Sequence, residues 1–201
     1  MNVDLDAVLA AFTAMQKWEI IAVMLGILYI ILAAKESVWC WVSGFFSTLI
    51  YTILFWEGQL LSSALLNFYY MGMSIYGFIL WKRGKGEVEK HLTVTSWPLS
   101  KHLFRIVTGV FFSLFAGYLL ATYTPARLPY LDAAVMVFSI LATWMLAQKI
   151  LENWLYWMVI DAAAITLYWS TGYYVTIILF MIYVILSLYG YFSWRKSKEG
   201  I

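Results

Sequence analysis

Charged residues are scarce in this sequence, and their scarcity limits the class of protein. Asp, Glu, Lys and Arg make up 12% of the 201 residues, whereas hydrophobic residues make up 64%. A soluble domain has about a quarter charged residues and roughly half apolar ones. No globular core hides such an excess, so most of the chain is expected to lie in lipid. The small net charge of +2, with scattered basic residues, argues against nucleic-acid binding.

Cysteine and the common catalytic motifs are nearly or wholly missing. Cys40 is the single cysteine, which excludes an intramolecular disulfide and a cysteine-rich metal cluster. The sequence contains no G-x-x-x-x-G-K-S/T phosphate loop, no H-E-x-x-H metal motif and no G-x-S-x-G nucleophile turn. We therefore expect no ATP hydrolysis by a phosphate loop, no enzyme activity, no metal and no cofactor.

Hydrophobic runs, in contrast, are long enough to cross a membrane seven times. A spanning helix needs about 20 mostly apolar residues. Seven stretches qualify: 17–34, 38–56, 60–81, 103–123, 131–147, 153–170 and 173–194. Residues 5–15 are mildly amphipathic and are expected at the membrane interface. The predicted fold class is therefore an all-α membrane protein with seven transmembrane helices.

The basic residues predict the orientation of these spans. With seven spans the two ends of the chain lie on opposite sides, and only Lys17 and Arg127 fall on the side of the N-terminus. The other 11 of the 13 Lys and Arg residues fall on the side of the C-terminus. Lys and Arg concentrate in cytoplasmic loops. We expect a bacterial inner-membrane protein with its N-terminus outside and its C-terminus in the cytoplasm.

The two halves of the chain resemble each other. Shifting the sequence by 113 residues lays the first half on the second without a gap. Trp41 then falls on Trp154, and residues 74–83 fall on residues 187–196. Both of these segments read Ser-x-Tyr-Gly-x-x-x-Trp followed by two basic residues. Such agreement indicates an internal repeat.

The repeat predicts one transporter domain over residues 1–201. It contains a three-helix unit at 17–81, a linker helix at 103–123 and a second three-helix unit at 131–194. Because one extra helix separates the units, both run the same way through the membrane, in a 3+1+3 parallel repeat. Transporters of this plan hold their substrate near mid-membrane between the repeats. The alternative is a duplicated bundle with no substrate.

Asp161 is the one acidic residue deep within an expected span. A carboxylate is costly there, and such residues usually mark a functional site. Trp154 and Trp157 share its helical face. An indole beside a carboxylate suits a flat aromatic cation, which stacks on the ring while the acid offsets its charge. The alternative is a protonated Asp161 that makes a hydrogen bond between helices.

The first unit supplies the opposite wall of this predicted site. Thr48 is the repeat counterpart of the acid, and Trp41 and Tyr51 share its face. Asn67 and Tyr70 offer polar groups at similar depth on the next span. Hydrogen bonds between helices are the alternative role for Thr48 and Asn67. Other tryptophans near span ends are expected to anchor the helices at the lipid interface: Trp56, Trp81, Trp169 and Trp194.

These residues resemble the PnuC family of vitamin transporters over essentially the whole chain. The most specific parts are residues 152–157 leading to Asp161, and the helix ends 76–81 and 189–194. The resemblance implies the 3+1+3 plan, which the sugar-carrying SWEET proteins share. It also implies facilitated diffusion of an unphosphorylated vitamin with no coupling ion, and a cytoplasmic kinase that then traps the vitamin.

The resemblance also bears on which vitamin is carried. Family members that carry nicotinamide riboside hold a Trp-x-x-x-Asn motif at the substrate. Trp157 falls on its tryptophan, but Asp161 stands where the asparagine is expected. Thiamine, a permanent cation, is therefore slightly favoured, with nicotinamide riboside next and neutral riboflavin behind. A membrane-embedded vitamin sensor or subunit is the remaining alternative, supported only by the long basic loop 82–102.

Overall fold

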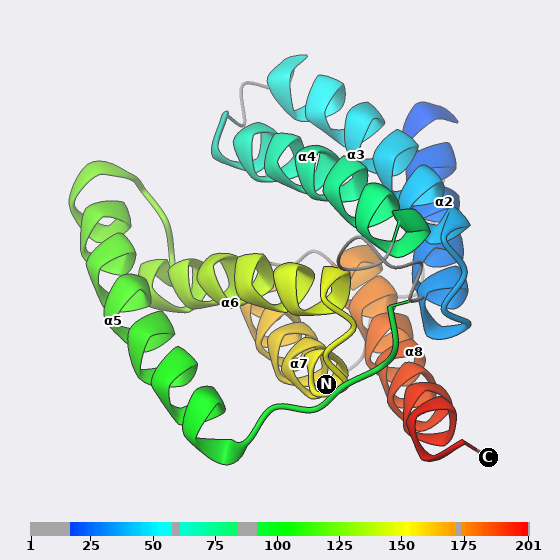
Figure 1. Ribbon diagram of the computed structural model, residues 1–201. Coiled ribbons are helices and arrows are strands. Elements are labelled where there is room, and N and C mark those ends of the chain that lie inside the picture. The colour runs from blue at the N-terminus through cyan, green and yellow to red at the C-terminus, as the bar shows by residue number, and fades with distance from the viewer. Residues whose placement is uncertain (1–16, 58–60, 84–91, 172–173, 201) are drawn as a thin grey trace.

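The computed structural model describes residues 17–57, 61–83, 92–171 and 174–200, which fold into seven α-helices. Figure 1 shows these helices, which have the following bounds: α2 Lys17–Ala34, α3 Trp39–Glu57, α4 Leu61–Arg83, α5 Leu99–Tyr123, α6 Pro129–Ala147, α7 Asn153–Thr171 and α8 Tyr174–Glu199. The expected all-helical fold is confirmed. The interfacial segment expected over residues 5–15 lies outside the described residues.

Six helices of the described chain are long and apolar enough to cross a membrane, and α7 is the exception. α7 carries Asp161 near its middle and begins with the polar Asn153. It packs against both α6 and α8. The outer helix surfaces are apolar, and on α5 Phe111 and Phe115 are among the exposed side chains. The chain is therefore a multi-pass membrane protein.

The helices form two groups of three, with α5 outside both (Figure 1). In one group α3 packs against α2 and α4, and in the other α7 packs against α6 and α8. The groups meet along two lines of contact, between α2 and α8 and between α4 and α6. His102 at the start of α5 reaches Tyr156 of α7, but along its length α5 packs against α6. Gly109 and Gly117 of α5 permit this contact, because Phe138 and Tyr130 of α6 lie directly against them.

The structure corrects the expected start of the linker helix. The run of apolar residues predicted a beginning at 103, but α5 begins at Leu99, directly after Pro98. Pro98 has a φ of −67°, which suits a helix start, and hydropathy misses the first turn because it is polar. Residues 92–98 before it are bonded to the connection between α6 and α7: the Thr95 N–H donates to the Lys149 carbonyl at 2.9 Å, and the Leu151 N–H donates to the Thr95 carbonyl at 2.8 Å.

Four tryptophans lie at the centre of the buried core, and we call them the tryptophan core: Trp41, Trp81, Trp154 and Trp194. No more than 7% of any of them is exposed. The ring centroids are 5.4 Å apart for Trp41 and Trp81 and again 5.4 Å apart for Trp154 and Trp194. Trp81 and Trp194, from different groups of helices, are 6.0 Å apart. The tryptophan core therefore joins the two groups.

The expectation that Trp81 and Trp194 are interfacial anchors is wrong. Trp81 Nε1 donates to the Ala147 carbonyl at 3.0 Å, and Trp194 Nε1 donates to the Ala33 carbonyl at 2.9 Å. Each bond satisfies the indole N–H inside the protein, so these rings need no contact with the lipid headgroups. The other two expected anchors, Trp56 and Trp169, are exposed, and their anchoring role stays a prediction.

Candidate functional site

Asp161 lies in the middle of α7, and its side chain is buried, with 2% of the residue exposed. Tyr183 of α8 lies close enough to interact electrostatically with both Asp161 and Tyr51 of α3. The Tyr183 hydroxyl oxygen also lies 3.3 Å from the position that a Cβ on Gly26 of α2 would take. Side chains from α3, α7 and α8 and the backbone of α2 therefore approach one region between the two groups. We call these residues the Asp161 cluster: Gly26, Tyr51, Asp161 and Tyr183.

Two members of this cluster were missed from the sequence alone. Tyr183 is the repeat counterpart of Tyr70, which was a candidate, so the repeat held the signal that could have found it. Gly26 gave no such signal, because a helical glycine is informative only when its neighbour on another helix is known. Its missing side chain leaves the space that the Tyr183 hydroxyl approaches.

Trp157 lies one turn before Asp161 and is partly exposed. Residues four apart in a helix share a face. Tyr51, the cluster member from α3, stacks on Phe55 with a centroid distance of 5.5 Å and an interplanar angle of 16°. The indole and the carboxylate predicted for the site therefore share one face of α7. Substrate contact by these residues stays a prediction.

The remaining polar candidates lie in the first group of helices. The Thr48 hydroxyl donates to the Gly44 carbonyl of its own helix at 2.8 Å, rather than to another helix. Asn67 and Tyr70 are partly exposed and three residues apart on α4, so they share a face. Next to them, the Tyr69 hydroxyl donates to the Ile140 carbonyl of α6 at 3.2 Å. Tyr69 therefore lies at the contact between the two groups.

Trp41 and Trp154 belong to the tryptophan core and not to the Asp161 cluster. They are 1% and 2% exposed. Trp41 lies directly against Gly77, and three ring atoms of Trp154 lie 2.7 Å from the position of a Cβ on Gly190. Trp154 also lies seven residues before Asp161, which is about 10 Å along a helix. These two indoles are placed as packing residues at the helix ends.

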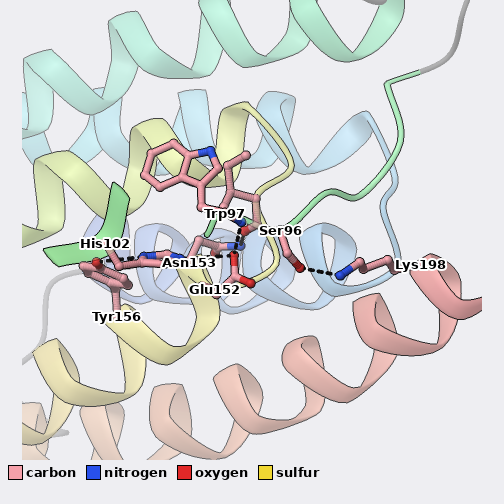
Figure 2. A network of polar contacts seen from close by, with 8 residues as sticks. Ser96, Trp97, His102, Glu152, Asn153, Tyr156 and Lys198 are labelled. Carbon is pink, nitrogen blue, oxygen red and sulfur yellow. Dashed lines mark hydrogen bonds and ion pairs between the residues drawn. The ribbon is translucent and has the colours of Figure 1, made fainter. Parts of the chain in front are cut away.

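A polar network holds the start of α7 in place, as Figure 2 shows. His102 Nδ1 lies 3.1 Å from the Tyr156 hydroxyl, and His102 Nε2 lies 3.6 Å from a Glu152 carboxylate oxygen. The same carboxylate accepts the Trp97 backbone N–H at 3.2 Å. α5, the loop before it and the start of α7 are therefore joined. This network positions the helix that carries Asp161.

Two cavities lie apart from the Asp161 cluster. The larger, of about 390 Å³, lies beside the start of α5, and Trp97, Arg105 and Trp144 are among its lining residues. None of the candidate site residues lines it. The smaller, of about 190 Å³, lies between α3 and α4 and is lined in part by Trp41 and Ser74. The described residues contain no group of three or more His, Cys, Asp or Glu that could hold a metal ion.

Comparisons with known proteins agree on one family. A family model described as nicotinamide mononucleotide transporter matches residues 16–196. The nicotinamide riboside transporter PnuC of Escherichia coli is 25% identical over 205 residues, which cover 90% of this chain and 86% of that protein. The riboflavin/roseoflavin transporter RibM of Streptomyces davaonensis is 25% identical over 186 residues, covering 90% and 87%.

A solved structure shares the fold. The crystal structure of the vitamin B3 transporter PnuC matches this chain with a TM-score of 0.77 and 21% sequence identity. The match covers 98% of this chain and 88% of that one. The arrangement of helices described above is therefore that of a known membrane transporter.

Proposed function

Since this chain belongs to the PnuC family of membrane transporters, whose model is described as nicotinamide mononucleotide transporter, we propose that it carries nicotinamide riboside across the membrane by facilitated diffusion. The family consists of transporters, which confirms the expectation from the sequence that the chain is not an enzyme. We further propose the orientation of the chain in the membrane and the residues that bind the substrate.

The Asp161 cluster is the observation that carries this proposal. It places a buried carboxylate and the two tyrosines Tyr51 and Tyr183 where the two groups of helices meet. A carboxylate favours the cationic pyridinium ring of the vitamin, and hydroxyl groups can bind its ribose. Trp157, one turn away on α7, offers a surface for stacking.

The same cluster favours the unphosphorylated form of the vitamin. A phosphate group in a membrane site needs a basic partner, because an uncompensated anion there is costly. No Lys or Arg occurs in α3, α6 or α7, and in α4 and α8 the basic residues are confined to the last turns. Next to Asp161 a phosphate would instead meet a negative charge.

The preference for thiamine drawn from the sequence found no support among the relatives. That preference rested on the charge of Asp161 alone, and nicotinamide riboside carries the same positive charge. Relatives from three further bacteria are named for nicotinamide riboside, whereas RibM is named for riboflavin. We therefore place nicotinamide riboside first and keep thiamine as the comparison ligand.

The architecture that accompanies this function is the 3+1+3 parallel repeat, with α5 as the linker helix. Equivalent contacts at the same spacing support it: Trp41 lies against Gly77, and Trp154 lies against Gly190. The two lines of contact between the groups, α2 with α8 and α4 with α6, are also equivalent under the repeat. In this arrangement α7 also spans the membrane, which makes seven spans in all, and a single domain holds one substrate pathway between the two units.

The distribution of the basic residues supports a C-terminus in the cytoplasm of a bacterial cell and an N-terminus outside the inner membrane. Facilitated diffusion alone equalises the vitamin on the two sides. Accumulation of the vitamin above its outside concentration therefore requires a cytoplasmic kinase, because phosphorylation converts the vitamin into a form that the Asp161 cluster disfavours.

Binding of purified protein to four ligands tests the substrate. We expect nicotinamide riboside to bind most tightly, thiamine less tightly and riboflavin weakly, with no binding of the phosphorylated nicotinamide mononucleotide. Isothermal titration calorimetry in detergent measures all four. Binding of the phosphorylated compound as tight as that of the riboside would contradict the proposed role of Asp161, and a preference for thiamine would restore the alternative from the sequence.

A further inference from the structure

Glu36 and Lys149 form an ion pair between the two groups of helices. The Lys149 Nζ lies 2.6 Å from a Glu36 carboxylate oxygen, and the side chains are 10% and 22% exposed, respectively. Glu36 follows the end of α2, and Lys149 follows the end of α6. The two residues are 113 positions apart in the sequence, which is the spacing of the repeat. The pair therefore joins equivalent positions of the two units.

The backbone at these two positions is also equivalent and unusual. Glu36 has a φ of 54° and Lys149 a φ of 52°, and among the described residues no other residue except glycine has a positive φ. Glutamate and lysine disfavour this left-handed conformation, which glycine adopts more readily. Glu36 and Lys149 therefore stand at positions where glycine would be less strained, which indicates that their side chains have a role. That role is the ion pair between them.

Two members of the tryptophan core lie beside the ion pair. The Lys149 Nζ lies 4.8 Å from the centroid of the Trp81 ring, and that ring packs beside Trp194. The N–H of each indole donates to a carbonyl of the opposite group, Ala147 for Trp81 and Ala33 for Trp194. One ion pair and two hydrogen bonds thus connect the units at this end. Water can replace such contacts when the units separate, so the connection is reversible.

We infer that the Glu36–Lys149 pair, with Trp81 and Trp194, is a gate that closes the path from the Asp161 cluster to the cytoplasm. This inference rests on the proposed function, in which the substrate moves between the two units and leaves on the side of Lys149. The gate opens when the ion pair breaks and the two indoles release the opposite carbonyls. The alternative is a permanent link that holds the units together at all times.

Cys40 provides a reporter for this gate. It is the one thiol in the chain, it is fully buried, and it belongs to the same cluster of buried residues as Trp81 and Trp194. It also follows Glu36 by four residues. A small maleimide can therefore react with Cys40 only when this end of the protein opens, and the labelling rate measures how often that happens.

The test compares labelling rates of folded protein in proteoliposomes without any substrate. Glu36→Gln and Lys149→Gln should each raise the rate roughly three- to tenfold, since the closed state loses a favourable pair while the open state loses nothing. The double exchange Glu36→Lys with Lys149→Glu should return the rate towards that of the wild type, because the positions are equivalent. The exposed pair Arg195–Glu199, 2.9 Å apart on α8, is the matched control, and Arg195→Gln should leave the rate unchanged.

If the pair is instead a permanent link, its loss should lower the melting temperature of both single variants. The labelling rate of the folded fraction should then stay at the wild-type value, and this result would overturn the gate. An equal rise in Arg195→Gln would also overturn it, because the effect would then not depend on this ion pair. The readout uses no vitamin, so failure of the protein to carry nicotinamide riboside would not change it.

Discussion

Gly190 supports a quantitative prediction about the tryptophan core. An added Cβ at this position would lie 2.7 Å from three ring atoms of Trp154. Carbon atoms in favourable contact are about 3.5–4.0 Å apart, so the Gly190→Ala methyl group would be too close by about 1 Å. Trp154 is 2% exposed, and Trp194 lies edge-on beside it at 5.4 Å. The ring therefore has no free space to move into.

The Gly190→Ala substitution should lower the free energy of unfolding because the added methyl group has no space. Inserting a methyl group into a well-packed core costs about 1–3 kcal/mol. Alanine also favours a helix over glycine by about 0.8–1.0 kcal/mol, which offsets part of that cost. Gly72→Ala is the matched control, because Gly72 also lies inside a helix and an added Cβ there meets nothing within 4 Å. The difference between the two variants isolates the steric term.

Thermal unfolding of both purified variants in the same detergent measures this difference. For a chain of this length, 1 kcal/mol corresponds to about 2–4 °C in Tm. Gly190→Ala should therefore melt roughly 2–12 °C below Gly72→Ala. Equal melting temperatures would show that the ring of Trp154 can shift at no cost, and the close packing of the tryptophan core would then be wrong.

Three further predictions concern the Asp161 cluster. Asp161→Asn removes one negative charge at constant size, so thiamine affinity should fall roughly ten- to a hundredfold. Nicotinamide riboside loses the same charge contact, but the change restores the Trp-x-x-x-Asn motif, whose amide should compensate for that loss, so its binding should be maintained. Calorimetry of the two ligands checks this, and unchanged thiamine affinity would make the acid structural. Trp157→Ala removes a stacking surface worth about 0.5–1.5 kcal/mol, so thiamine and nicotinamide riboside should both bind roughly two- to tenfold more weakly. Wild-type affinity of this variant would exclude stacking on Trp157. Tyr183→Phe keeps the ring and removes the hydroxyl, so nicotinamide riboside affinity should fall by up to roughly tenfold with an unchanged Tm. A lower Tm with wild-type affinity would instead assign the hydroxyl to packing.

Hydropathy predicted the helices well because each must place apolar side chains in lipid along its whole length. It failed at Leu99, where a polar first turn precedes the apolar part of α5. The burial of Trp81 and Trp194 could not be predicted, since it depends on the carbonyl groups of Ala147 and Ala33 in the opposite unit. Such contacts depend on how the units pack together, and periodicity describes only one helix at a time.

The candidate site, like the fold, could be predicted from the sequence only in part. Asp161 was identified because a carboxylate inside a span is costly and therefore conspicuous. Trp41 and Trp154 were selected because they share a face with Thr48 and Asp161, but a helical face continues for several turns, and these two indoles lie at its packed end. Tyr183 was missed because nothing in its own helix distinguishes it from the other tyrosines of α8.

Uptake of labelled nicotinamide riboside into sealed proteoliposomes tests the central claim most directly. With no ion gradient and no ATP, we predict that the vitamin enters until its concentrations inside and outside are equal, and that no accumulation follows. A requirement for a sodium or proton gradient would contradict facilitated diffusion. Binding of the vitamin without any uptake would contradict transport and would make the protein a membrane-embedded sensor.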